Sequence, residues 1–315
     1  MNSNTLSGLY VVERLNTDNL TDVGRLYNAV YNKLADPDFF EKKYDTAFTG
    51  VEYTGFIAYN NHQPIAFYAV IPCLIKCGDK VVLSAQSADT MTHPDHRNKG
   101  LFVELALTTF QLCRDLNIQL LFGFPNQNSL PGFVNKLGWR VADIMDCFII
   151  HTGGFSFKRL MDKLPGFKNL YGSYQKRVLK KYLAKESAID NSVFKDGCSG
   201  LYRDELYFKY KTYTDTKIIK IGASTLWVKF SSIILIGDVS VQPDDFDDMI
   251  YGLKKLANKL GIKQIHFHAS PGTTLHSLFA MRFNSIPSFP VIFKVLGGDL
   301  HTDKIKFTSS DIDTF

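Results

Sequence analysis

The sequence predicts an α/β (α+β) protein in which a mixed, mostly antiparallel sheet is flanked by helices and the plan is duplicated in two halves. Three observations predict this fold class. The chain has 315 residues, more than a single hydrophobic core usually needs. Segments with helical spacing alternate with short strand-like runs. The order strand, strand, helix, strand, helix also occurs twice along the chain.

The first half contains both kinds of segment in order. Apolar residues recur at helical spacing in residues 21–32, 36–44 and 100–116. Aromatic and β-branched residues dominate short runs that end in turns, which predicts strands at residues 53–59, 65–72, 81–91 and 120–124. A polar loop and a short helix follow, up to Trp139.

The second half repeats this plan after a change in composition. Residues 153–213 are rich in Lys, Tyr and Phe and carry one helical pattern at 173–183. Strands are then expected at 218–222, 223–230 and 232–241, a helix at 246–260, and a strand ending at His268. We therefore predict a first domain at 1–152, a connecting region at 153–213 and a degenerate second domain at 214–315.

Composition and charge limit the function classes. The formal net charge is +5, and the basic residues are mostly interleaved with acidic ones, so no nucleic-acid partner is expected. The densest basic stretch, residues 175–181, fits a solvated helix face. No apolar run approaches the length of about 20 residues that spans a membrane, and the first ten residues do not resemble a signal peptide, so we expect no membrane association and a cytoplasmic location. The five cysteines are scattered, and Cys73 and Cys77 lack partners at zinc spacing, so no metal is expected.

A basic turn precedes the helix at 100–116. Arg97 and Lys99 supply positive charge, and Gly100 lets the backbone approach a ligand closely. The free amide groups of a helix start bind phosphate, so this turn is a candidate pyrophosphate site. A generic surface turn is the alternative interpretation.

Two segments carry a family resemblance. Residues 92–102, THPDHRNKGLF, resemble the acetyl-CoA signature of the GNAT N-acetyltransferase superfamily, and residues 126–139 resemble its second signature, an Asn-containing loop with a short helix. The resemblance covers about residues 8–150 and implies a GNAT-type sheet with acetyl-CoA as co-substrate. It implies that the central strand splays from its neighbour at residues 89–92. The implied cofactor-binding residues are Met91, Thr92, His93, Arg97, Asn98, Lys99, Gly100, Leu101, Phe102 and Asn128.

Some of these roles have alternatives, and some positions depart from the family pattern. Met91 and His93 would bind the pantetheine arm through backbone groups, and His96 or Asn98 could contact phosphate oxygens. Local turn and capping chemistry would equally explain Asn126, Asn128 and Ser129. Phe102 stands where the family has a small residue, and Val134 stands where it often has a proton-donating Tyr, so no catalytic acid is identified. Asp89 is the best candidate for the catalytic base, although it could instead pair within the sheet; His93 and Glu52 are further candidates.

The second half has no equivalent anion site. The turn at residues 241–248 contains four aspartates, no glycine and no basic residue, so it would repel a pyrophosphate. His266, His268 and His276 could contact an acceptor. Sheet and loop histidines are the alternative, because no carboxylate or cysteine accompanies them at ligand spacing.

The expected enzyme is an N-acetyltransferase that moves an acetyl group from acetyl-CoA to a primary amine. The acceptor would be a small polar molecule, such as an amino sugar, an aminoglycoside-like compound or an amino acid. A Fem-like aminoacyl or peptidyl transferase and a non-catalytic acyl-CoA-binding module are the alternatives. A homodimer is one possible assembly.

Overall fold

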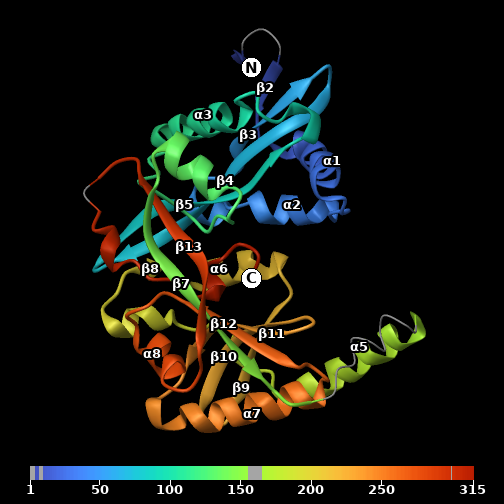
Figure 1. Ribbon diagram of the computed structural model, residues 1–315, viewed down its shortest axis with the longest axis vertical. Helices are drawn as coiled ribbons and strands as arrows, with labels where there is room; N and C mark the ends of the chain where they lie inside the picture. Colours follow the sequence, from blue (N-terminus) through green and yellow to red (C-terminus); the bar gives the residue numbers. More distant parts are fainter. Residues whose placement is uncertain (1–3, 7–9, 155–164, 299) are drawn as a thin grey trace. The chain divides into compact units, whose positions relative to one another are not determined.

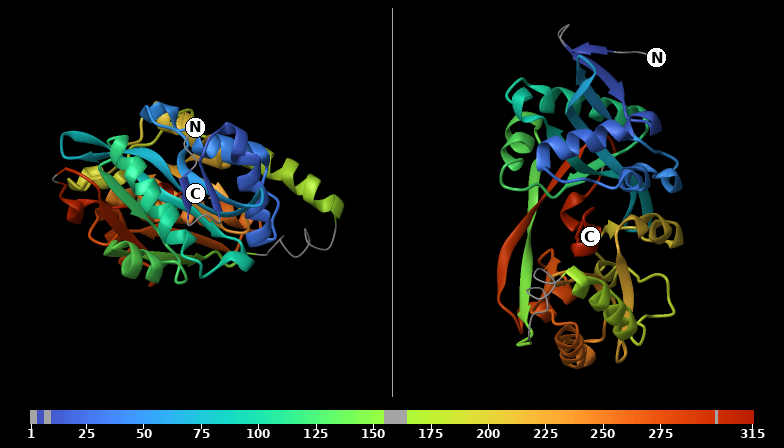
Figure 2. Two further views of the ribbon diagram at one scale, coloured as in Figure 1. Left: turned by 90° about the horizontal axis from the view of Figure 1, so that it is seen from above. Right: turned by 90° about the vertical axis from the view of Figure 1, so that its right-hand side faces the viewer.

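The computed structural model describes residues 4–6, 10–154, 165–298 and 300–315 (Figures 1 and 2). Part of the predicted connecting region, residues 155–164, therefore lies outside the described residues. The chain forms two compact units, each built from separate stretches of sequence. Unit 1 comprises Met1–Ala142, Lys209–Tyr213 and Pro290–Asp303, and unit 2 comprises Asp143–Phe208, Thr214–Phe289 and Lys304–Phe315. The predicted domain boundaries at residues 152 and 213 stay a prediction.

Unit 1 contains six strands and the end of a seventh, in the order β1-β2-β3-β4-β5-β6-β13. Their bounds are Asn4–Leu6, Tyr10–Arg14, Thr54–Asn60, Gln63–Cys77, Lys80–Thr92 and Leu120–Gly123, with β13 at Ser285–Val295. Strands β5 and β6 pair in parallel, and the other pairs in this run are antiparallel. The last residues of β13, Ile292–Val295, pair with β6, so the strand beside β6 comes from near the end of the chain.

Helices cover both faces of the unit 1 sheet. Helices α1 (Leu20–Tyr31) and α2 (Pro37–Tyr44) lie on one face, and α3 (Leu101–Asp115) lies on the other (Figure 1). Alternate residues of β4 therefore enter different cores: Phe67 packs with α1 and α2, whereas Tyr68 packs with α3. Because both faces are buried, the strand is continuously apolar rather than alternating.

Strand β5 separates from β6 near its end. Their pairing runs from Ser84 opposite Leu120 to Gln86 opposite Phe122, and β6 stops one residue later while β5 continues to Thr92. Beyond its pairing with β6, strand β5 is still paired with β4 and carries a β-bulge, in which Asp89 has φ of +48°. A bulge adds a residue to one strand and bends it, which is common beside functional sites. The end of β5 is thus free of its parallel neighbour.

Unit 2 has the strand order β7-β12-β11-β10-β9. These strands are β7 (Arg140–His151), β12 (Gln264–Ala269), β11 (Ile234–Ser240), β10 (Ser224–Phe230) and β9 (Thr216–Ile221). Only β11 and β12 pair in parallel among these neighbours. Helices α7 (Phe246–Lys259) and α8 (Thr274–Ala280) pack on one face around a single apolar cluster. The parallel pair β11–β12, joined by α7, repeats the arrangement of β5 and β6 joined by α3 in unit 1. The predicted mixed, mostly antiparallel sheet with flanking helices is confirmed.

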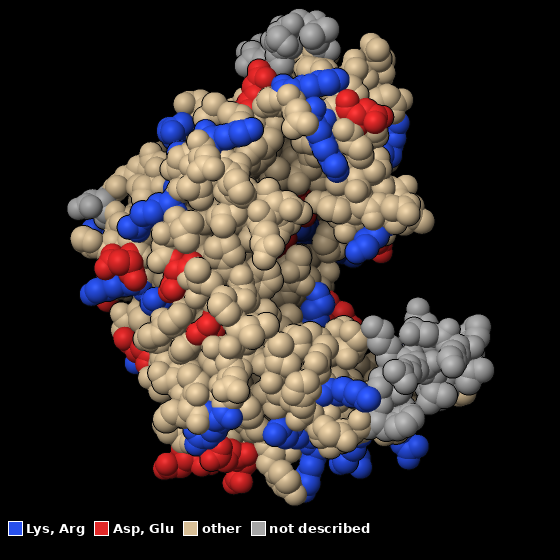
Figure 3. Space-filling view, viewed as in Figure 1, with Lys and Arg blue, Asp and Glu red and all other residues tan. Residues whose placement is uncertain are grey.

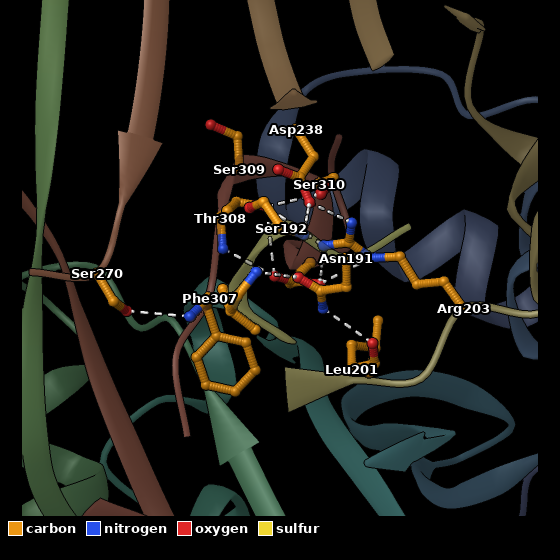
Figure 4. Close-up of polar contacts among 12 residues, drawn as sticks. Asn191, Ser192, Leu201, Arg203, Asp238, Ser270, Phe307, Thr308, Ser309 and Ser310 are labelled. Carbon is orange, nitrogen blue, oxygen red and sulfur yellow. Dashed lines mark hydrogen bonds and ion pairs between the residues drawn. The ribbon is translucent and has the colours of Figure 1, made fainter. Parts of the chain in front are cut away.

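Unit 2 contains a buried ionic cluster that includes residues near the end of the chain (Figure 4). Arg203 lies between two carboxylates, 2.6 Å from Asp238 and 2.5 Å from Asp311, and all three side chains are fully buried. Its guanidinium also donates to Thr308. Because an unpaired buried charge is costly, this cluster fixes the segment at residues 308–311 against β11.

The connecting stretch contains α5 (Pro165–Leu179), β8 (Gly200–Leu201) and α6 (Glu205–Tyr210). Five strands were not predicted: β1, β2, β7, β8 and β13. Among the described residues, no helix combines the length and apolarity needed to cross a membrane.

Candidate functional site

A cavity of about 600 Å³ lies in unit 1 beside the free end of β5. It is bounded by β5, the turn before α3, the first residues of α3 and the segment after β6. Its lining residues are Val30, Tyr31, Thr90, Thr92, His96, Arg97, Asn98, Lys99, Gly100, Leu101, Phe102, Val103, Asn126, Asn128, Ser129, Pro131, Gly132, Asn135 and Lys136. All the predicted cofactor-binding residues except Met91 and His93 are therefore brought together at this cavity.

The turn before α3 presents backbone amides to the cavity. Asn98 and Gly100 have φ of +62° and +81°, in the left-handed region that glycine adopts most easily. Gly100 is the N-cap of α3, and no side chain caps the helix start. The first amides of an uncapped helix have no partner within the helix, so they can bind an anion. This geometry fits the predicted pyrophosphate role.

The charge of the lining is positive. Arg97, Lys99 and Lys136 face the cavity, and no Asp or Glu is among the described residues that line it. Burial, followed by the charge of Lys99, lowers the pKa of His96, which keeps its imidazole neutral at pH 7. Its buried Nδ1 atom has no hydrogen-bond partner among the described residues. His96 therefore lines the cavity as a neutral side chain.

Phe102 packs across the cavity wall. Its ring centroid lies 5.4 Å from that of Phe133, and a Cβ atom added at Gly132 would come within 2.9 Å of its ring. Phe102 thus fills the space that a smaller residue would leave empty at this position. Its ring fits there because Gly132, which it contacts, has no side chain. Gly132 begins a five-residue π-helical turn, Gly132–Lys136, which directs Asn135 and Lys136 to the cavity.

The two asparagines of the loop after β6 have different roles. Asn126 Oδ1 accepts hydrogen bonds from the amides of Asn128 (2.9 Å) and Ser129 (3.0 Å), so Asn126 caps the following helical turn. The Asn128 side chain is exposed and lines the cavity, with no side-chain hydrogen bond found among the described residues. Asn128 is thus the asparagine that remains free for a ligand, and its binding role stays a prediction.

The remaining predicted cofactor residues lie outside the lining. The Met91 side chain is 1% exposed and belongs to the core under α1 and α2. The His93 ring accepts a hydrogen bond from the Asp95 amide and caps the short turn at residues 94–96. The His93 amide donates to Ile65 O at 2.7 Å. Any role of Met91 and His93 in binding would have to involve backbone groups that these contacts leave free.

Asp89, the candidate base, forms an ion pair behind the bulge. Its Oδ2 atom is 2.6 Å from Lys43 Nζ and accepts a hydrogen bond from the Tyr44 hydroxyl at 2.7 Å. The Lys43 side chain is 2% exposed, so Asp89 neutralises a buried charge. Glu52 is exposed and is not part of the cavity lining. The catalytic role of Asp89 stays a prediction.

Tyr31 is a functional candidate that the sequence analysis did not identify. It ends α1 and is the tyrosine among the described lining residues. Burial and then the nearby Asp89 carboxylate raise the pKa of its phenol, so the hydroxyl stays protonated at neutral pH. Because helix α1 and the cavity turn are far apart in sequence, only the fold brings this phenol to the site.

The histidines of unit 2 have partners that their spacing did not reveal. His276 Nε2 is 2.8 Å from Asp146 Oδ2, across more than a hundred residues of chain. Cys147 lies beside His266 and His268, with one ligand atom of each residue within 4.8 Å of the others. The start of α7 is acidic, as Asp247 and Asp248 in its first turn show, and acidic side chains gather at that end of unit 2 in Figure 3.

The family model of the acetyltransferase (GNAT) domain matches residues 11–142. No match was found among curated proteins by sequence.

Solved structures share the fold at low sequence identity. A conserved protein from Enterococcus faecalis V583, described as a probable N-acyltransferase, is 10% identical with a TM-score of 0.61, over 91% of this chain and 73% of that one. A GCN5-related N-acetyltransferase from Kribbella flavida is 12% identical with a TM-score of 0.60, over 91% and 72%. Another from Anabaena variabilis ATCC 29413 is 12% identical with a TM-score of 0.56, over 91% and 73%. Residues 11–142 thus match a GNAT acetyltransferase domain, and the chain shares the fold of these solved structures.

Proposed function

We propose that the chain transfers an acetyl group from acetyl-CoA to the primary amine of a small polar acceptor. One observation carries the proposal: the uncapped start of α3, with Arg97 and Lys99 before it, opens into a cavity beside the splayed end of β5. This arrangement suits a donor whose pyrophosphate is anionic and whose pantetheine arm is extended. Asn128 would hydrogen-bond that arm.

The reaction forms a carbon–nitrogen bond and breaks the thioester carbon–sulfur bond. The amine must lose a proton, and the leaving thiolate must gain one. We assign the second step to Tyr31, because its phenol lines the cavity and its raised pKa keeps the proton available. Val134, at the position of the family's usual tyrosine, has no proton to donate and does not line the cavity.

The donor site is tested by calorimetric titration of acetyl-CoA into the full chain. Each lost charge-assisted contact is worth about 1.5–3 kcal/mol, so Arg97→Ala with Lys99→Ala should weaken binding by at least about 100-fold. The control is Lys176→Ala with Arg177→Ala on α5 of unit 2, which should bind normally. We expect one site per chain, because the acidic start of α7 would repel a second pyrophosphate. Equal affinity in both double variants would refute the assignment.

Acetyl transfer is tested by the release of free thiol across a panel of amino sugars, aminoglycosides and amino acids. Tyr31→Phe should lower kcat by about 100-fold and remove the decline of kcat at alkaline pH, since deprotonation of the phenol causes that decline. Tyr27→Phe is the matched control, because the Tyr27 ring lies 4.9 Å from that of Tyr31 and is not in the lining. Acetyl-CoA binding without transfer to any amine would favour the non-catalytic module, and turnover with aminoacyl-tRNA would favour the Fem-like transferase.

A cytoplasmic location, a homodimer and a degenerate GNAT-like domain at residues 214–315 remain parts of this proposal. The repeated parallel pair, β5–β6 in unit 1 and β11–β12 in unit 2, supports the last of these.

A further inference from the structure

Three metal-ligating side chains meet on one face of the unit 2 sheet. Strands β7 and β12 are antiparallel, with His268 opposite Cys147 and His266 opposite Ile149. Side chains alternate between the faces of a strand, so His266 and His268 share a face, and Cys147 projects from the same one. The other face carries Phe148 and Phe267, which pack in the core.

The donor atoms are close enough to share one ion. One ligand atom from each of Cys147, His266 and His268 lies within 4.8 Å of the other two. Tetrahedral zinc, with bonds of about 2.0–2.3 Å to nitrogen and sulfur, needs ligand atoms roughly 3.3–3.8 Å apart. Closing the difference takes about 1 Å, which small side-chain rotations supply. Cysteine sulfur and histidine nitrogen are both ordinary ligands of zinc.

Hydrogen bonds around the cluster orient both imidazoles for ligation. The Ser288 hydroxyl donates to Met145 O at 2.9 Å, so its oxygen must accept from His268 Nδ1 at 3.0 Å. The His268 proton therefore lies on Nδ1, and Nε2 keeps a free lone pair. His266 Nε2 is 3.3 Å from Gln264 Oε1, an acceptor, which leaves the lone pair of His266 on Nδ1. Such partners are the usual outer support of a metal-bound histidine.

A metal-bound cysteine is a thiolate, so an arriving cation would displace the proton of the Cys147 thiol and form the negative ligand.

We propose that Cys147, His266 and His268 form a zinc site that links β7 to β12, with the fourth position open to water. The three residues hold strands that are more than a hundred positions apart in the chain, so the ion would stabilise unit 2. This proposal departs from the absence of metal expected from the sequence, and it is independent of the donor site in unit 1.

The test is titration of the untagged, chelator-treated full chain with Co²⁺ and then Zn²⁺. We expect one equivalent of Co²⁺ to give a thiolate-to-metal charge-transfer band and strong tetrahedral ligand-field bands, both of which Zn²⁺ removes. Zn²⁺ should also raise the thermal midpoint of unit 2, because it binds the folded state.

Cys147→Ser and His268→Gln should each weaken Zn²⁺ binding by about 100-fold or more, as measured against a chromophoric chelator. Cys113→Ser, a buried thiol in unit 1, and His62→Gln, an exposed histidine, are the matched controls and should bind as the native protein does. If Cys147→Ser does not fold, His266→Gln gives the same comparison. No saturable one-to-one binding to the native chain, or equal affinity in the ligand and control variants, would overturn the proposal.

Discussion

Replacing Asp89 with Asn removes the negative charge beside the buried ammonium of Lys43. The two charged atoms are 2.6 Å apart, and the Lys43 side chain is 2% exposed. The Asn amide can still accept the hydrogen bond from Tyr44, and Asn tolerates the positive φ of 48° at this position. The substitution therefore changes charge with little change in shape or backbone.

The expected cost follows from these contacts. Removing one partner of a buried ion pair costs about 3–5 kcal/mol, because the remaining charge stays in the interior. Lys43 also lies 5.5 Å from the centre of the Phe39 ring, and this cation–π contact offsets about 1 kcal/mol. We therefore expect Asp89→Asn to lower the free energy of unfolding of unit 1 by about 2–4 kcal/mol at pH 7.

The chain offers a direct probe of unit 1. It has two tryptophans, Trp139 in unit 1 and Trp227 in unit 2. In a Trp227→Phe background, urea unfolding followed by fluorescence reports unit 1 alone. Asp38→Asn is the matched control, because its ion pair with Lys42 is 3.8 Å long and both side chains are more than half exposed. That control should change stability by less than about 0.5 kcal/mol.

A second substitution separates stability from catalysis. Lys43→Met in the Asp89→Asn background removes the buried ammonium and should restore most of the lost stability. An Asp89→Asn protein with the native urea midpoint and slope would refute the ion-pair reasoning. If the stabilised double variant still lacks acetyl transfer, Asp89 takes part in the reaction as well; if transfer returns, its role is to hold Lys43.

Three further predictions concern packing, reactivity and the ionic cluster. Gly132→Ala should destabilise unit 1 by about 1–2 kcal/mol more in the native background than in a Phe102→Leu background, since the added methyl meets the Phe102 ring; urea titration measures the difference. Cys113, whose pKa burial raises to about 12 from an ordinary value near 9, should react with iodoacetamide at pH 8 about 1000-fold more slowly than an ordinary thiol, as peptide mass spectrometry of time points would show; a rate within tenfold of that of an ordinary thiol would contradict it. Arg203→Met should destabilise unit 2 by about 3–5 kcal/mol, because two buried carboxylates lose their partner, whereas Asp311→Asn should cost less since it leaves a neutral pair; calorimetric unfolding of both variants ranks them.

Much of the fold could be predicted because helices and strands depend on local patterns. Helices α1, α3 and α7 lie within one or two residues of their expected bounds, since their apolar stripes are regular. Strand β13 was missed because Pro287 and Pro290 interrupt its pattern. Its pairing with β6 is decided by contacts across more than 150 residues, which no local pattern records.

The sequence by itself determined the candidate donor site. The turn from Arg97 to Gly100 and the helix after it form one continuous segment, so their charge, backbone freedom and amide groups follow from adjacent residues. Tertiary structure alone decided what surrounds that segment. It placed Tyr31 on the cavity wall and paired Asp89 with Lys43, and in unit 2 it set Cys147 opposite His268. These pairings depend on strand register and helix packing, in which residues far apart in the chain become neighbours only when the cores form.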